Sequence, residues 1–215
     1  MLELYTFFRS SASFRVRIAL NLKGLAWTPR AVWLPAGEQA AAPYRAVNPQ
    51  GLVPTLVDAG HRIAQSLAII EYLDETRPQP RLLPADPLGR ARVRSLSLLV
   101  AAETHPLNNL RVLDYLRDRL GLGEAAVADW YRHWCDEGLS AFERQLGDGG
   151  SGRFCHGDQP TMADVCLVPQ IFNARRFDTR VERYPAVMRI FDACMQLEAF
   201  RKAEPSAQPD AARAR

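Results

Sequence analysis

The chain has 215 residues, 47% of them hydrophobic and 24% charged, a composition typical of globular proteins with one large domain or two small ones. The formal net charge is only +3 at pH 7, and no dense basic run is interleaved with aromatic residues, so nucleic acid is not an expected partner. The sequence begins without a basic signal-peptide region and has no apolar run of about 18 residues, which predicts a cytoplasmic protein that does not enter a membrane.

Residues 1–82 predict a mixed α/β domain. Positions 2–6 alternate as in a short strand. Apolar side chains then recur at helical spacing over 14–22, and Gly24 follows where a left-handed cap would end that helix. The apolar run at 31–34 predicts a second strand.

Two strand-to-turn junctions follow in the same domain. Residues 48–51, Asn-Pro-Gln-Gly, are a turn signal, and the apolar run after them contains Pro54. A proline there indicates an edge strand or an irregular start, and the Val53–Pro54 bond is a candidate for the cis form. A brief strand at 61–64 leads to Ser66, which is placed to cap a helix with one apolar stripe.

A proline-dense stretch separates this domain from the rest of the chain. Four prolines lie between residues 76 and 87, which forbids a helix and predicts a linker at 83–87. The remainder, 88–215, predicts an all-α domain. Its first long helix starts at Asp86–Pro87, and Pro106 is expected to interrupt or kink it.

Three further features describe the helical region. Residues 124–146 predict a second long helix, and Thr161 and Asp164 have the spacing of a capping box. We interpret this pair as stabilising the fold and not as catalytic. The Ala-, Pro- and Arg-rich tail after Glu204 predicts disorder.

The cysteines predict no cross-links and no metal site. They show neither C-x-x-C spacing nor clustering with histidine, and are Cys135, Cys155, Cys166 and Cys194. In a chain without a secretion signal, buried free thiols are the expected state. No set of His, Cys and carboxylate residues has the spacing of metal ligands.

Chemistry is expected first where the initial strand turns into the first helix. Ser10 and Ser11 lie at that turn, and the free amides and positive dipole of a helix start favour an anion. A serine hydroxyl can also donate to a thiolate. Serines at a helix start usually serve only as caps, so this signal is weak alone.

Two more positions have the character of a site for a peptide-like ligand. A cis bond before Pro54 would turn the backbone of Val53 outward as a donor and acceptor, whereas an ordinary edge proline would not. Gln65 and Ser66 lie at a strand-to-helix junction whose amides and side chains can hold an α-carboxylate. Plain helix capping is the alternative interpretation of that pair.

In this order and spacing, the features resemble glutathione transferases over about residues 1–205. The resemblance implies an α/β thioredoxin-like N-terminal domain, a linker and an all-α C-terminal domain. More narrowly, several stretches are similar to the zeta class of that family. They are 9–20 (Arg-Ser-Ser-Ala-Ser-Phe-Arg-Val-Arg-Ile-Ala-Leu), Asn48-Pro49-Gln50, 105–109 (His-Pro-Leu-Asn-Asn), and Val168-Pro169-Gln170 followed by Arg176-Phe177.

The resemblance implies glutathione as the cofactor. Ser10 and Ser11 would lie beside its sulfur. Ala12 occupies a slot where zeta proteins commonly carry Cys or Thr, so Ser10, Ser11 or a helix-start amide must activate the thiol. The positions implied in holding the rest of glutathione are Gln50, Val53, Pro54, Gln65, Ser66, Asn108 and Asn109.

For a zeta-class protein the implied activity is glutathione-dependent cis–trans isomerisation of a maleyl keto acid. The thiolate would add reversibly to the cis double bond, which lets the resulting single bond rotate before the thiolate leaves. Arg9 and Arg176 would clamp the acidic substrate, with Arg175 as the alternative to Arg176, and His105 would donate a hydrogen bond.

Several alternatives stay open on the sequence. Maleylacetoacetate and maleylpyruvate are not distinguished as substrates. A broad transferase that conjugates electrophiles would share the glutathione site, and a non-catalytic binding protein would share the fold. The family also implies a homodimer.

Overall fold

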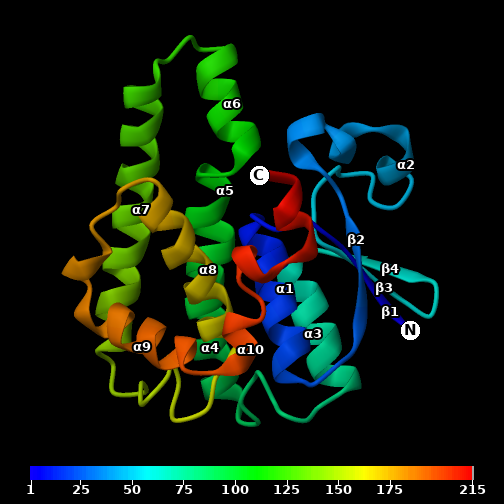
Figure 1. Cartoon of the computed structure of the whole chain (residues 1–215). Coiled ribbons are helices and arrows are strands. Elements are labelled where there is room, and N and C mark those ends of the chain that lie inside the picture. Colours follow the sequence, from blue (N-terminus) through cyan, green and yellow to red (C-terminus); the bar gives the residue numbers. More distant parts are fainter. Residues whose placement is uncertain (215) are drawn as a thin grey trace. The chain divides into compact units, whose positions relative to one another are not determined.

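A four-stranded sheet organises the first of two units in the computed structural model, which describes residues 1–214. This first unit comprises Met1–Leu83 together with Met195–Arg215, and the second comprises Pro84–Cys194. The first unit has the predicted α/β thioredoxin-like character, and the second is helical (Figure 1).

The sheet has the strand order β2-β1-β3-β4, in which β1 runs parallel to β2 and antiparallel to β3, and β4 runs antiparallel to β3. Helices α1 and α3 pack against the sheet through a shared apolar core. The elements are β1 (Leu2–Thr6), α1 (Ser11–Leu22), β2 (Trp27–Ala31), α2 (Ala42–Arg45), β3 (Thr55–Asp58), β4 (His61–Ala64) and α3 (Ser66–Thr76). The core consists of Leu2, Leu4, Val16, Leu20, Leu56, Ile69 and Leu73.

The second strand lies earlier than predicted. The sequence pointed to residues 31–34, but β2 spans Trp27–Ala31, and a 3₁₀ turn begins at Leu34. Strand β2 is an edge strand whose residues are half-buried or exposed, so it lacks the apolar pattern that predicts a strand. It also contains Pro29, which an edge position tolerates.

A buried lysine fixes the path of the proline-rich segment after α3. The Nζ atom of Lys23 donates to Asp74 Oδ1 at 2.8 Å, to the carbonyl of Arg77 at 2.8 Å and to that of Pro80 at 2.9 Å. Asp74 in turn accepts the amides of Leu82 and Leu83. The segment that ends the first unit is therefore held by charge-assisted hydrogen bonds rather than by regular structure.

The prediction of a disordered tail after Glu204 is wrong. The tail continues from α10 (Glu198–Arg201) into two 3₁₀ turns, Pro205–Ala207 and Pro209–Ala214. Asp210 is only 8% exposed and accepts the amide of Phe8 at 2.8 Å. The tail therefore belongs to the first unit and not to the helical domain 88–215. The sequence did not predict this, because the composition of the tail gives no sign of the hydrogen bond that Asp210 accepts.

The second unit contains the predicted long helices. Asp86 caps α4 by accepting the amide of Gly89 at 2.6 Å, and a π-helical turn, Leu99–Thr104, interrupts the helical path just before Pro106. The elements are α4 (Pro87–Leu98), α5 (His105–Leu107), α6 (Leu110–Asp118), α7 (Glu124–Leu146), α8 (Met162–Arg176) and α9 (Pro185–Met195). Among residues 1–214, none of the helices is long and apolar enough to cross a membrane.

Thr161 and Asp164 form the predicted capping box at the start of α8. The carboxylate of Asp164 is fully buried and accepts the amides of Thr161 at 2.7 Å and of Cys155 at 2.8 Å. All four cysteines are free and buried, as predicted. Thr161 and Asp164 therefore stabilise the fold, because they join the start of α8 to the segment before it.

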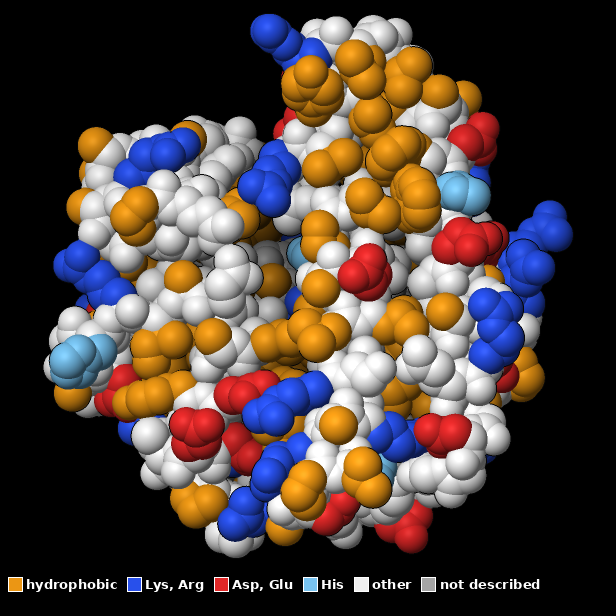
Figure 2. Space-filling model, turned by 180° about the vertical axis from the view of Figure 1, so that it is seen from behind, with side chains coloured by type: hydrophobic (Ala, Val, Ile, Leu, Met, Phe, Trp, Pro, Cys, Tyr) orange, Lys and Arg blue, Asp and Glu red, His pale blue; other side chains and the backbone are white. Residues whose placement is uncertain are grey.

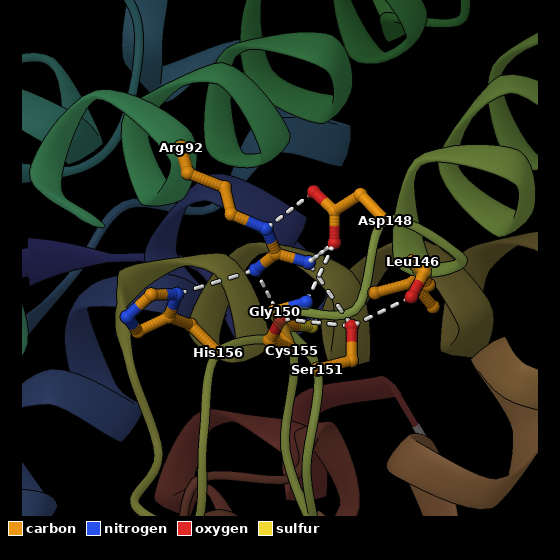
Figure 3. A network of polar contacts seen from close by, with 7 residues as sticks. All are labelled: Arg92, Leu146, Asp148, Gly150, Ser151, Cys155 and His156. Carbon is orange, nitrogen blue, oxygen red and sulfur yellow. Dashed lines mark hydrogen bonds and ion pairs between the residues drawn. The ribbon is translucent and has the colours of Figure 1, made fainter. Parts of the chain in front are cut away.

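Arg92 of α4 organises the connection between α7 and α8 (Figure 3). Its Nε and Nη2 donate to the two carboxylate oxygens of Asp148 at 2.6 and 2.7 Å. Its Nη1 donates to the carbonyl of Cys155 at 2.6 Å and contacts His156 Nδ1 at 3.3 Å, while Nη2 also donates to Ser151 Oγ at 3.0 Å. The hydrogen bonds from Arg92 hold the pKa of the Asp148 carboxyl below its usual value.

We expect Arg92→Ala to lower the free energy of unfolding by about 2 kcal/mol, since it removes a bidentate ion pair and frees a buried carbonyl. Urea denaturation followed by circular dichroism measures the change. Arg90→Ala is the matched control, because Arg90 lies on the same helix and makes one exposed hydrogen bond, to the carbonyl of Ala85. Equal stability of the two variants would contradict the role given to Arg92.

Candidate functional site

The strand register brings three candidate segments to one edge of the sheet. Tyr5 near the end of β1 pairs with Thr55 at the start of β3, and Thr55 pairs with Ala64 at the end of β4. The chain before Thr55, the chain after Thr6 and the chain after Ala64 therefore meet at the same edge. The turn at Ser10, the Val53–Pro54 bond and the Gln65–Ser66 junction all belong to these segments.

The start of α1 offers unpaired donors. Ser10 is the N-cap residue, and its Oγ accepts the amide of Ser13 at 3.2 Å. Ser11 is the first helical residue and is 5% exposed. Within residues 1–214, the backbone amides of Ser11 and Ala12 have no acceptor. A capping role for Ser10 is thus compatible with anion binding at the helix start. Ser10 bonds the amide of Ser13 and leaves the amides of Ser11 and Ala12 available to an anion.

The Val53–Pro54 peptide bond is cis, the first of the two alternatives that the sequence left open. Neither the amide nor the carbonyl of Val53 has a hydrogen-bond partner in the part of the chain that the structure describes. The carbonyl of the preceding Leu52 is held by Tyr44 Oη at 2.6 Å and by Asn48 Nδ2 at 2.7 Å. The loop is therefore fixed on one side, while the Val53 backbone remains able to pair with a peptide-like ligand.

At the start of α3, the structure places Gln65 and not Ser66 in the N-cap position, without a side-chain cap. Gln65 has φ +71° and ψ +118°, a conformation that non-glycine residues rarely adopt. Its Nε2 donates to Gln50 Oε1 at 2.9 Å, so two predicted ligand-binding side chains meet. Ser66 is 6% exposed, and its Oγ accepts from Arg15 Nη1 at 3.3 Å.

Apart from Arg9, the remaining candidates belong to the second unit, and two of them have clear partners there. Asn108 is 5% exposed and donates from Nδ2 to the carbonyl of Tyr131 at 3.1 Å. Asn109 is the N-cap of α6 and accepts the amide of Arg111 at 3.3 Å. Asn108 thus bonds the interior of α7 and Asn109 caps α6, and their contact with glutathione stays a prediction.

Arg176 is the last residue of α8 and is exposed, and its Nη1 donates to Asn173 Oδ1 at 3.0 Å. The next residue, Phe177, stacks on the ring of Tyr131 with centroids 3.7 Å apart. Arg175 instead lies over the ring of Phe191 at 4.8 Å. The two arginines thus have different surroundings, and Arg176 is the one beside Tyr131 and the Asn108 contact.

Arg9 and His105 complete the set of candidates. Arg9 is exposed in the turn before α1, with its guanidinium 5.0 Å from the ring centroid of Phe8. His105 is half-buried at the first position of α5. Their proposed contacts with substrate stay predictions.

The sequence analysis missed the residues that support the turn before α1. Arg17 is fully buried, and it donates to Thr6 Oγ1 at 3.1 Å and to the carbonyl of Phe8 at 2.9 Å. Burial lowers the pKa of Arg17 to about 9, and the charge of Asp210 opposes that shift. An arginine two turns into an apolar helix is a usable signal in the sequence, but Asp210, 202 positions from its partner Phe8, carries none.

The sheet edge has the donors and acceptors that an anionic peptide with a thiol would need. Two helix starts supply unpaired amides, which favour a thiolate and a carboxylate, and the Val53 backbone can pair with a main chain. Within residues 1–214, no group of three or more His, Cys, Asp and Glu side chains is arranged to hold a metal ion.

Comparison with protein families identifies both parts of the chain. Residues 4–81 match the glutathione S-transferase N-terminal domain, and residues 124–193 match the glutathione S-transferase C-terminal domain. A maleylacetoacetate isomerase of Rhizobium meliloti is 52% identical over 202 residues, which cover 94% of this chain and 95% of that protein. A maleylpyruvate isomerase of Ralstonia sp is 47% identical over 212 residues, covering 98% and 100%.

Solved structures give the same picture. A holo structure of maleyl pyruvate isomerase, described as a bacterial zeta-class glutathione S-transferase, is similar with a TM-score of 0.94 and 47% identity, over 97% of this chain and 99% of that one. A maleylacetoacetate isomerase of Anaeromyxobacter dehalogenans 2CP-1, with glutathione bound in its active site, has a TM-score of 0.89 and 46% identity, over 98% of each chain.

The backbone of Gln65 generates a stability prediction. Glycine adopts positive φ without a Cβ clash, so Gln65→Gly should be more stable than Gln65→Ala by about 1 kcal/mol, although glycine gains entropy on unfolding. Urea denaturation of both variants measures the difference. At the exposed helical control position Glu75, Ala should be the more stable substitution. If Ala exceeds Gly at residue 65 as well, the positive φ is not a source of strain.

Proposed function

The chain belongs to the glutathione S-transferase family, and on that premise we propose that it is a glutathione-dependent cis–trans isomerase of a maleyl keto acid. The most direct support comes from the edge of the sheet where the starts of α1 and α3 and the Val53 backbone meet. Backbone amides at both helix starts have no acceptor within residues 1–214. The chain is also similar along nearly its whole length to proteins named as such isomerases. Glutathione acts as a cofactor that each turnover regenerates.

The reaction begins with formation of the glutathione thiolate. The amides of Ser11 and Ala12 and the helix dipole stabilise the negative sulfur, which lowers the pKa of the thiol. The Ser11 hydroxyl, which has no hydrogen-bond partner in residues 1–214, can donate to it as well. Ala12 itself offers only its amide. The proton leaves to solvent, and the thiolate is the nucleophile.

The isomerisation then requires no net consumption of glutathione. The sulfur adds to one carbon of the cis double bond, and the electron pair moves onto the conjugated ketone to form an enolate. Rotation about the new single bond follows. The enolate then restores the double bond in the trans form and expels the thiolate.

The other end of glutathione has a matching partner. The unpaired amides at the start of α3, together with Ser66 Oγ, fit the γ-glutamyl carboxylate. The joined side chains of Gln50 and Gln65 are exposed and offer amide donors and acceptors to the peptide. Asn108 and Asn109 remain proposed contacts at the rim.

Arginine side chains are suited to the substrate, which carries carboxylate and developing enolate charge. We assign Arg9 and Arg176 to these charges and His105 to the substrate carbonyl or glutathione. Both arginine side chains are exposed, so a ligand carboxylate can reach each of them from solvent.

The deciding experiment mixes the purified protein with maleylacetoacetate and with maleylpyruvate, each with and without glutathione, and follows the enol chromophore and the products. We expect rapid cis-to-trans conversion only when glutathione is present. The faster substrate identifies the physiological reaction, since relatives of both names are similar to nearly the whole chain. Conjugation of a test electrophile without isomerisation would instead assign the chain to the conjugating transferases.

We expect Arg176→Ala to raise KM for the keto acid about tenfold, because a charge-assisted pair to its carboxylate is lost, while the affinity for glutathione is unchanged. Steady-state kinetics and calorimetric titration with glutathione measure the two quantities. Arg175→Ala is the matched control, because that side chain lies on Phe191. Unchanged turnover of Arg176→Ala at low substrate would remove Arg176 from the site.

A homodimer is the proposed assembly. Leu88 and Leu98 on α4 are 83% and 46% exposed, and Leu98 lines a shallow hollow of about 480 Å³. Apolar side chains also gather over the end of α6 and α7, where Leu110, Tyr115, Leu120 and Leu122 are exposed (Figure 2). A second copy would cover such surfaces. Gel filtration that shows only monomer would contradict the proposed homodimer.

A cytoplasmic location is also proposed, and the free cysteines are consistent with it.

A further inference from the structure

The C-terminal tail supports the turn that carries the thiol-binding residues. We propose that Asp210 is a positioning residue for the reaction: by holding the amide of Phe8, it sets the turn that presents Ser11 and the free amides of α1 to the glutathione sulfur. This inference rests on the proposed function, and it adds a requirement that the tail be folded for the thiolate to form.

The first observation is the contact itself. Oδ2 of Asp210 accepts the amide of Phe8 at 2.8 Å, and the two residues are 8% and 6% exposed. Phe8 lies two positions before Ser10, whose own amide donates to the carbonyl of Phe7 at 3.0 Å. Because the bond is buried and charge-assisted, it restrains the turn more strongly than a solvent-exposed contact would.

The second observation is that the other side of the same peptide is held as well. Arg17 donates from Nη2 to the carbonyl of Phe8 at 2.9 Å and from Nη1 to that of Phe7 at 3.3 Å. Its Nε donates to the carbonyl of Ala203 at 3.1 Å, just before the tail. The buried Arg17 therefore holds the carbonyl of Phe8, and the buried Asp210 holds its amide. Both contacts connect the turn to the C-terminal region.

The third observation concerns the tail beyond this anchor. Arg213 lies 4.7 Å from the ring centroid of Trp33 and 3.7 Å from Glu38. The ring of Trp33 is stacked on that of Phe8 at 6.0 Å. The tail thus reaches Phe8 through its backbone, by Asp210, and through its aromatic neighbour, by Arg213.

These contacts bear on catalysis because amide donors stabilise a thiolate only when they are held in place. A loosened turn would let Ser10 and Ser11 shift by fractions of an ångström, and water would replace the aligned amides. The pKa of bound glutathione would then rise toward that of the free thiol. Asp210 touches neither the cofactor nor the substrate in this scheme and acts through Phe8.

The test compares Asp210→Ala, Asp210→Asn and Glu198→Ala in the full chain. Glu198 is the matched control, since it is an exposed carboxylate near the tail that pairs with the exposed Lys202 at 2.8 Å. The ultraviolet absorbance of bound glutathione thiolate is titrated against pH, and hydrogen exchange of the Phe8 amide is measured by nuclear magnetic resonance. Kinetics at neutral pH supply kcat and KM.

For Asp210→Ala we expect the thiol pKa to rise by about one unit and kcat at neutral pH to fall about tenfold. Exchange of the Phe8 amide should become faster. Asp210→Asn retains an acceptor without its charge, so it should shift the titration less, in the same direction. Glu198→Ala should match the unmodified protein in all three measurements.

The inference is overturned if the Phe8 amide exchanges faster in Asp210→Ala while the thiol titration stays where Glu198→Ala has it. In that case Asp210 serves only the fold. If Asp210→Ala does not fold, an unshifted titration in Asp210→Asn overturns it equally. Failure of the unmodified protein to bind glutathione would instead refute the proposed function, and the exchange data would still report whether Asp210 holds Phe8.

Discussion

The pairing of β3 with both β1 and β4 is the constraint on which the candidate site depends. Thr55 pairs with Tyr5 on one side and with Ala64 on the other, so two strand ends and one strand start share a single edge. A shift of one residue in either pairing would turn the strand faces over and move the helix starts apart. The turn at Ser10 and the Gln65–Ser66 junction are separate, weak signals in the sequence. They form one candidate site because this register places both at the same edge of the sheet.

Buried cations of the α1 segment hold the chain on either side of that edge and beyond it. Arg15 donates to the hydroxyl of Ser66, and Arg17 donates to the carbonyls of Phe7 and Phe8. Lys23, the C-cap residue at the opposite end of α1, donates to carbonyls of the segment after α3. Burying three cations is costly unless their hydrogen bonds are made. The helix that presents the thiol-binding amides is thus also the one that fixes the irregular chain around them.

The elements with strong local signals were predictable from the sequence. Helix α7, the Asp86–Pro87 helix start and the Thr161 capping box all follow from periodicity or from capping residues at the right spacing. The sequence marked the Val53–Pro54 bond only as a candidate for the cis form that the structure shows. Edge strand β2 and the folded tail were not predictable, because neither has an apolar pattern. The unusual φ of Gln65 was hidden too, since a glutamine in the sequence gives no sign of a positive φ.

The alanine at position 12 becomes intelligible once the helix start is seen. Ser10 Oγ already accepts a hydrogen bond from the amide of Ser13, which uses one of its two lone pairs and leaves its proton to donate. The amides of Ser11 and Ala12 are independent of side-chain identity, so a residue without a donor at position 12 still contributes its N–H to an anion. In the proposed mechanism, activation of sulfur by the backbone amides would not depend on the side chain at position 12. It would depend on the turn before them, which Arg17 and Asp210 hold.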